Sequence, residues 1–188
     1  AGRRGIAGTV FVHKIAGAKA EMSGSLEEVK AVAEKVISNV RTMGMSLSSC
    51  IIPAVGKANF EIGHDEVEIG MGIHGEPGTH REKISSADSV AEQLMSKIFS
   101  DIELKGGDEV SVMINGLGST TNMELFIVNK KVNEILKDKG IEVYKTFVGE
   151  FMTSLEMAGC SISILKLDNE LKELLEDSAD TPALDRKS

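Results

Sequence analysis

The sequence predicts an α/β fold: a single layered domain in which helices flank a mixed sheet of five or six strands. Short runs of β-branched and apolar residues alternate with segments of helical period along the chain, and a length of 188 residues suits one domain. Apolar residues make up 41% of the chain and charged residues 27%, which is typical of a protein that folds around a core. We expect the domain to span residues 1–184 and residues 185–188 to form a tail.

The first elements follow from local residue patterns. Residues 8–15 are rich in β-branched side chains and predict a strand. Ser25 and Glu28 have the spacing of a capping box, and apolar residues recur behind them at three- and four-residue steps, which predicts a helix over residues 26–40. The glycine within residues 43–45 is expected to end that helix.

The remaining elements continue the alternation. Residues 50–53 predict a short strand, and strict alternation over residues 66–73 predicts a strand with one face in solvent. A second capping box, Thr121 and Glu124, opens a helix that Gly140 is expected to end. The other expected helices are 87–98 and 170–176, and the other expected strands are 110–114, 141–148 and 161–167. From Asp177 onward we expect an irregular segment.

Composition excludes several classes of partner. The 21 basic and 29 acidic residues give a net charge of −8, and aromatic residues make up 4%, so nucleic acid is not an expected partner. The apolar runs are too short to span a membrane, so we expect no membrane partner. The cysteines, Cys50 and Cys160, are expected to be buried or semi-buried thiols in a reducing compartment, which we take to be the cytoplasm. The chain begins without Met or an apolar signal segment, which we interpret as a piece of a longer protein.

The most distinctive segment is the glycine-rich run over residues 70–78, which contains His74. A histidine between glycines at the end of a strand can meet a ligand that approaches the backbone closely. Imidazole has a reference pKa of about 6.5, so as a residue type it can act as a nucleophile or a base near neutral pH. The alternative is a flexible turn in which His74 is merely solvated.

Two other segments are weaker candidates. Residues 115–121 run from a predicted strand into a capped helix and could hold an anion, or they could form a tight turn. His13 and Lys14 could contact a partner or ligand, or they could be ordinary surface residues. The four histidines are scattered, so we expect no metal site in this chain. The acidic pairs Glu27/Glu28 and Glu66/Glu68 are interpreted as exposed charge.

Taken together, five segments resemble one family in order and spacing. They are Gly2–Thr9, His13–Ala18, Arg41–Met45, Gly70–Gly78 and Asn115–Thr120. The chain is similar to the C-terminal half of the dihydroxyacetone-binding subunit, or domain, of dihydroxyacetone kinase. The resemblance extends from Gly2 to about Leu184, and the segment around His74 is its most specific part.

The resemblance implies that His74 is both the catalytic and the substrate-binding residue. In that family the ring nitrogen adds to the ketone carbon of dihydroxyacetone as a covalent hemiaminal, and a terminal hydroxyl is then phosphorylated. The resemblance implies no cofactor in this chain, because nucleotide and magnesium belong to a kinase partner subunit or domain. It also implies a homodimer. In one branch of the family a phosphotransferase-system donor recharges the partner, and in the other branch ATP exchanges freely, so the phosphoryl donor stays open.

The resemblance leaves alternatives open. The family's acid and second histidine near the reacting hydroxyl belong to the N-terminal half, so we assign no general base and expect these 188 residues alone to be inactive. The second interpretation is a dihydroxyacetone-sensing paralogue that co-activates a transcription factor. The third is a scaffold domain that supplies dimer contacts.

Overall fold

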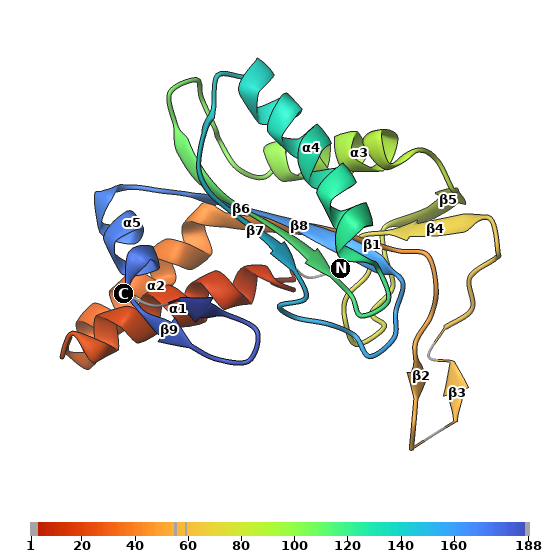
Figure 1. The fold of residues 1–188 in the computed structure, drawn as a ribbon, viewed down its shortest axis with the longest axis horizontal. Helices are drawn as coiled ribbons and strands as arrows, with labels where there is room; N and C mark the ends of the chain where they lie inside the picture. Colours follow the sequence, from red (N-terminus) through yellow and green to blue (C-terminus); the bar gives the residue numbers. More distant parts are fainter. Residues whose placement is uncertain (1–3, 55, 59, 187–188) are drawn as a thin grey trace.

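The computed structural model describes residues 4–54, 56–58 and 60–186, and its centre is a six-stranded sheet (Figure 1). The helices are α1 (Gly8–Glu21), α2 (Leu26–Asn39), α3 (Ala87–Phe99), α4 (Asn122–Asp138) and α5 (Asn169–Glu176). The strands of the sheet are β1 (Val40–Ser46), β4 (Glu66–Ile69), β5 (His80–Lys83), β6 (Glu109–Gly116), β7 (Glu142–Gly149) and β8 (Gly159–Lys166). Two short hairpins are formed by β2 (Ile51–Ile52) with β3 (Lys57–Ala58) and by β9 (Ala179–Asp180) with β10 (Asp185–Arg186).

The sheet is mixed, which confirms the predicted fold class. Its strand order is β5-β4-β1-β8-β6-β7. The strands β6 and β7 pair in parallel and are joined through α4, whereas the other neighbours pair antiparallel. A parallel pair needs a crossover connection, and the capped helix that the sequence predicts after β6 supplies it.

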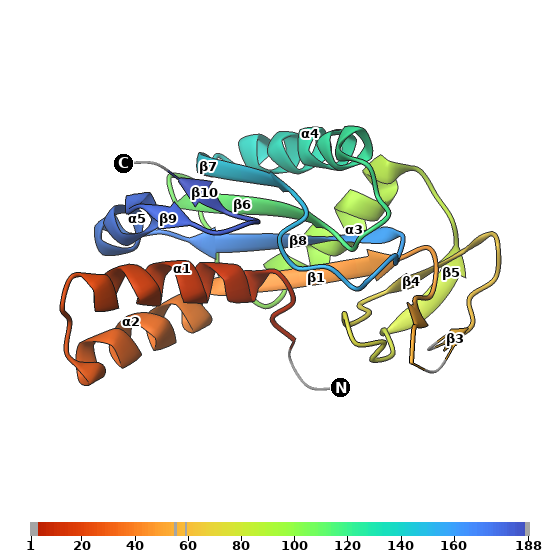
Figure 2. The same cartoon turned by 60° about the horizontal axis from the view of Figure 1, so that its bottom comes forward.

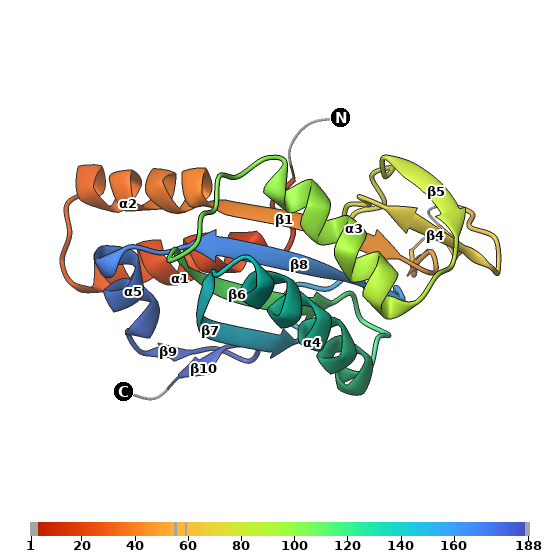
Figure 3. The same cartoon turned by 90° about the horizontal axis from the view of Figure 1, so that it is seen from above.

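Helices cover both faces of the sheet and create two separate cores. Figure 2 shows α4 on one face of the sheet and α1 and α2 on the other, and Figure 3, the view from above, shows α3 and α4 in front of the strands. The core under α3 and α4 contains Val110, Val112 and Ile114 of β6, whereas Met113 of the same strand belongs to the core of α1, α2 and α5. Successive side chains of a strand point to opposite faces, and residues 110–116 of β6 are all buried, so both faces of this strand are covered.

The strand predicted over residues 8–15 is wrong, because this segment forms the first part of α1. Phe11, Ile15 and Ala18 are buried at steps of four and three residues, which is the period of one helix face. They pack in the same core as α2 and α5. β-branched residues lose only a few tenths of a kcal/mol in a helix, so burial of this face decides the conformation.

Two further boundaries differ from the prediction. The helix α2 ends at Asn39, and residues 43–45 lie inside β1 instead of forming the helix end. Strand β4 stops at Ile69 instead of residue 73, because Gly70 turns the chain with φ of +83°. The charged strand β5 was not predicted, and residues 179–186 contain a hairpin where an irregular segment was expected.

Other elements are confirmed. Capping boxes open α2 at Ser25 and α4 at Thr121, and Gly140 follows α4 with φ of +68°. The remaining predicted helices and strands lie within about two residues of their expected bounds. Residues 1–3, of which 2 and 3 belong to the first family segment, and residues 187–188 of the predicted tail lie outside the described residues. None of the described helices has the length and apolar character that crossing a lipid bilayer requires.

Candidate functional site

The segment Gly70–Gly78, here called the His74 loop, connects β4 to β5. Thr79 N–H donates to the Ile69 oxygen at 2.7 Å and so joins the two ends of the loop. Gly70 N–H donates to the Gly44 oxygen of β1, also at 2.7 Å. Gly70 and Gly75 have φ of +83° and +84°, which lie in the left-handed region that favours glycine. The loop therefore leaves the sheet by a turn and returns to the neighbouring strand.

His74 projects from this loop into solvent, with 80% of its side chain exposed. Its ring Nδ1 lies 3.1 Å from Glu76 Oε1, and its backbone N–H donates to Glu76 Oε2 at 3.0 Å. The other ring nitrogen, Nε2, has no hydrogen-bond partner among the described residues. The imidazole is thus held on one side and open to a ligand on the other.

Contacts with the backbone of the His74 loop hold Glu76 in place. Gly72 N–H donates to the Glu76 backbone oxygen at 3.1 Å, and a Cβ at Gly72 would overlap the Glu76 carboxylate. Partial burial on its own raises the pKa of Glu76, but hydrogen bonds from its own backbone N–H and from His74 outweigh burial and leave this pKa below its ordinary value. The carboxylate is therefore ionised at neutral pH. Glu76 was not predicted from the sequence, although an acid two residues from His74 was a usable signal.

The ends of the His74 loop are tied to the rest of the protein. Arg4 Nη1 donates to the Gly70 oxygen at 2.9 Å, and the Ser154 hydroxyl donates to the Ile73 oxygen. At the other end, Glu68 Oε1 accepts from Gly78 N–H at 2.6 Å. Glu68 is 4% exposed, so its interpretation as exposed charge is wrong. The alternation of apolar and polar residues predicted that Glu68 faces solvent, but the end of the His74 loop covers that face of β4.

The second candidate segment, residues 115–121, forms a tight turn. Leu117 N–H and Ser119 N–H donate to the oxygens of Gly159 and Met157 at 3.2 and 3.1 Å. Gly118 N–H bonds Glu150, whose pKa is nevertheless raised because partial desolvation dominates. These amides are satisfied inside the protein, which favours a structural turn over an anion site.

The third candidate, His13 and Lys14, lies away from His74 on α1. His13 is exposed, and Lys14 Nζ donates to the Leu174 oxygen at 2.9 Å. Both residues line a groove of about 620 Å³ between α1 and residues 177–184. Within the described part of the chain, no group of three or more histidine, cysteine or acidic side chains is gathered to hold a metal ion.

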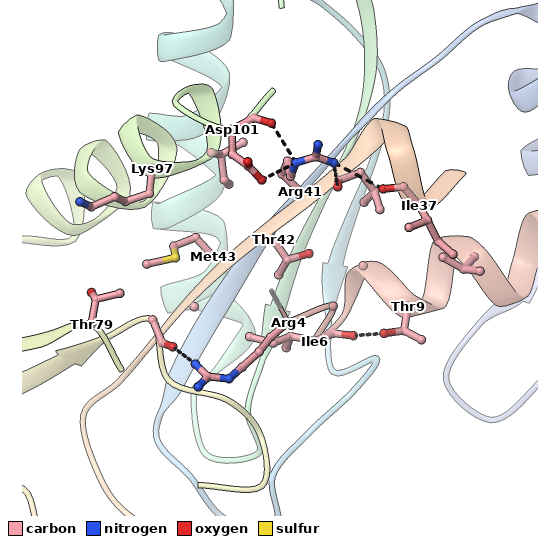
Figure 4. A pocket seen from close by; sticks show the side chains of 17 residues that line it. Arg4, Ile6, Thr9, Ile37, Arg41, Thr42, Met43, Thr79, Lys97 and Asp101 are labelled. Carbon is pink, nitrogen blue, oxygen red and sulfur yellow. Dashed lines mark hydrogen bonds and ion pairs between the residues drawn. The ribbon is translucent and has the colours of Figure 1, made fainter. Parts of the chain in front are cut away.

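A cavity of about 560 Å³ lies between α1, α2, β1 and α3 (Figure 4). Its lining is largely apolar, with Arg41 held by Asp101 at the rim in an ion pair. It touches the His74 loop only at Gly70 and does not include His74. The reactive side chain predicted from the sequence therefore lies outside this cavity, and the cavity is not the centre of the candidate site.

Comparisons with a family model and with curated proteins point to the same family. Residues 1–183 match the family described as the Dak1 domain. The PTS-dependent dihydroxyacetone kinase 1, dihydroxyacetone-binding subunit DhaK, of Listeria innocua is 55% identical over 169 residues, which cover 90% of this chain and 51% of that protein. The chain spans about half of the length of the curated relatives that it matches, from 51% to 54% for three of them.

Solved structures share the fold. One is the dihydroxyacetone kinase operon co-activator Dha-DhaQ, with a TM-score of 0.86, 35% identity, and coverage of 93% of this chain and 55% of that one. Another is the dihydroxyacetone kinase of C. freundii, in its native form and in complex with AMP-PNP and Mg²⁺. Its TM-scores are 0.80 and 0.79, its identities are 32% and 31%, and coverage is 93% of this chain and 32% of that one.

Proposed function

Because the chain belongs to the Dak1 domain family, we propose that it supplies the histidine, His74, that captures dihydroxyacetone covalently in a dihydroxyacetone kinase. The observation that carries this proposal is the exposed imidazole, held through Nδ1 and unpartnered at Nε2, at the tip of a loop fixed at both ends. The name of the Listeria relative, a dihydroxyacetone-binding subunit at 55% identity, supports the substrate.

The chemistry is an addition to a ketone. The Nε2 lone pair forms a bond to the central carbon of dihydroxyacetone, and the carbonyl π electrons move to oxygen, which takes a proton from water. The alkylated ring is then a cation next to the Glu76 carboxylate, and loss of the Nδ1 proton to solvent gives the neutral hemiaminal. No atom of the triose is lost, and the step is reversible.

Covalent capture lets the protein distinguish a small polar ketone from other small polar molecules. A triose offers little surface, so binding contacts alone distinguish it poorly from other polyols. The addition requires a carbonyl, so glycerol is not held in this way. The phosphoryl group is transferred to a terminal hydroxyl of the tethered substrate, and His74 never carries it. Holding that hydroxyl in place lowers the barrier through positioning.

In this proposal the phosphoryl donor is bound by another subunit or domain and not by these 188 residues. Nucleotide and magnesium are held by a kinase partner subunit or domain, which is recharged by a phosphotransferase-system donor in one branch of the family and exchanges ATP freely in the other. The "PTS-dependent" name of the Listeria relative and the AMP-PNP and Mg²⁺ complex of the C. freundii kinase support this division. We further propose a homodimer in the cytoplasm, and that these 188 residues alone are inactive because the chain spans about half of its relatives.

A second candidate function is a non-catalytic sensor of dihydroxyacetone that co-activates a transcription factor. The structure of a dihydroxyacetone kinase operon co-activator, which superposes with a TM-score of 0.86, favours it. A sensor and a kinase subunit would both retain His74, so capture of the triose does not separate them.

Two measurements test these functions. The complete gene product is incubated with dihydroxyacetone and its intact mass is measured, and we expect a gain of one whole triose that disappears in His74→Gln. His64→Gln, which changes another exposed histidine, is the matched control and should keep the gain. Absence of adduct in the wild type overturns capture. A coupled phosphorylation assay with the kinase partner then separates the kinase subunit, which turns over, from the sensor, which does not.

A further inference from the structure

The carboxylate of Glu76 contacts His74 twice. Oε1 lies 3.1 Å from the ring Nδ1, and Oε2 accepts the backbone N–H of His74 at 3.0 Å. An ionised carboxylate only accepts hydrogen bonds, so the Nδ1 that faces it must carry a proton. In a neutral ring, the lone pair then resides on Nε2, which is the nitrogen that points to solvent.

We propose that Glu76 is a positioning residue that holds His74 in the Nδ1–H tautomer and thereby makes Nε2 the nitrogen that attacks the ketone. The consequence for capture rests on the function proposed for His74, whereas the tautomer is a property of the protein without substrate. A carboxylate that bonds the distal nitrogen of a reactive imidazole fixes both the tautomer and the orientation of the ring.

The comparison with His64 shows why Glu76 is more than a neighbouring charge. His64 Nδ1 also lies 3.0 Å from a carboxylate, that of Asp65, but both side chains are almost fully exposed. The Glu76 side chain is 39% exposed, packs against Gly72 and is bonded to the His74 backbone as well as the ring. The Glu76 carboxylate is therefore anchored independently of the ring that it orients.

The substitution Glu76→Gln tests the proposal at nearly constant size. An amide has one accepting oxygen and one donating nitrogen. If the oxygen takes the His74 backbone N–H, the amide nitrogen faces Nδ1 and can bond it only when Nδ1 carries the lone pair. We therefore expect the ring to change to the Nε2–H tautomer, and the rate of capture to fall about 10- to 100-fold.

Nitrogen-15 NMR of the histidine rings reads the tautomer directly, since a protonated ring nitrogen and a lone-pair nitrogen have very different shifts. The spectra are recorded on the complete gene product without substrate, and His74 is assigned by its loss in His74→Gln. Asp65→Asn is the matched control: it changes the signals of His64 and leaves the rate of capture unchanged. A change of tautomer is not expected from a residue that only stabilises the fold.

A second variant tests the proposal independently, in case Glu76→Gln does not fold. Gly72→Ala keeps Glu76 but places a methyl group where its carboxylate lies, so the carboxylate must leave the ring. We expect the same loss of the Nδ1–H tautomer. The Nε2–H tautomer in the wild type, or retention of Nδ1–H in both variants, overturns the proposal. If the tautomers behave as expected but no triose is captured by the wild type, the proposed function fails and the positioning role stands.

Discussion

Glu68 and Arg81 are direct partners across the β4–β5 pair, and Arg81 Nε lies 2.8 Å from Glu68 Oε2. The other oxygen of the same carboxylate accepts Gly78 N–H at the end of the His74 loop. The side chain of Glu68 is 6% exposed, whereas that of Arg81 is 44% exposed. One buried carboxylate therefore connects the strand pairing to the loop that carries His74.

Replacing this carboxylate is expected to weaken both connections. In Glu68→Gln, the amide nitrogen must face either Arg81 or Gly78 N–H, and a donor then meets a donor. We expect a decrease of about 1–3 kcal/mol in the free energy of unfolding, measured by urea denaturation. Arg81→Met is the comparison, because a double-mutant cycle isolates the pair. Equal stability of Glu68→Gln and the wild type would contradict this role.

Two glycines should respond to alanine in opposite directions. Gly118 has φ of +127°, and a Cβ there would overlap the Leu155 oxygen, so Gly118→Ala should destabilise the protein by more than about 1 kcal/mol. Gly17 lies exposed in α1 with open space around its Cβ position, so Gly17→Ala should stabilise it by about 0.5–1 kcal/mol. Thermal unfolding of both variants checks the pair, and the same sign of shift in both would be inconsistent with the fold.

Acid should weaken the ion pair of Asp108 and Lys166, whose Oδ2 and Nζ lie 2.7 Å apart. The hydrogen bond from the Lys166 side chain lowers the pKa of Asp108 below its ordinary value, and the backbone N–H of Lys105 makes the next largest contribution. Because the folded-state pKa is the lower one, the stabilisation is complete above about pH 4 and is lost as pH falls through the folded-state pKa.

Asp108→Asn is therefore expected to cost about 1 kcal/mol at pH 7 and progressively less as the pH falls below about 4. Urea denaturation across this pH range provides the measurement. Glu103→Gln breaks a fully exposed pair with Lys105 and should have a smaller effect at every pH. A cost that persists at low pH would show that Asp108 stabilises the protein without its charge.

The two thiols should be unreactive in the folded protein. Burial raises the pKa of Cys160 to about 12, with a smaller contribution from Glu124, and Cys50 is 3% exposed. Thiolate is the reactive form, so iodoacetamide at pH 8 should modify neither cysteine before unfolding and both in urea, as counted by intact mass. Modification of the native protein at the rate of a free thiol would contradict the burial.

Much of the fold is predictable from local patterns, and the exceptions have physical reasons. The capping boxes at Ser25 and Thr121 identify α2 and α4 because the cap chemistry is local. The segment that forms α1 favours a strand by composition, and only its packing against α2 and α5 makes it helical. Strand β5 has no apolar pattern, since its place at the sheet edge needs none.

His74 is the one residue of the candidate site that sequence patterns singled out, and its catalytic role stays a prediction. His74 stands out because glycines surround it, and the structure places it in the exposed position that a nucleophile needs. The supporting carboxylates were not found. Glu76 acts through a bend of the loop, and Glu68 is covered by a segment ten residues further along the chain, so neither contact is encoded in strand periodicity.

The outermost strand of the sheet, β5, consists of His80, Arg81, Glu82 and Lys83. An unpaired edge invites another chain to add a strand, and a row of charged side chains opposes such addition because their hydration would be lost. Copies of this protein are therefore discouraged from polymerising through the edge next to the His74 loop.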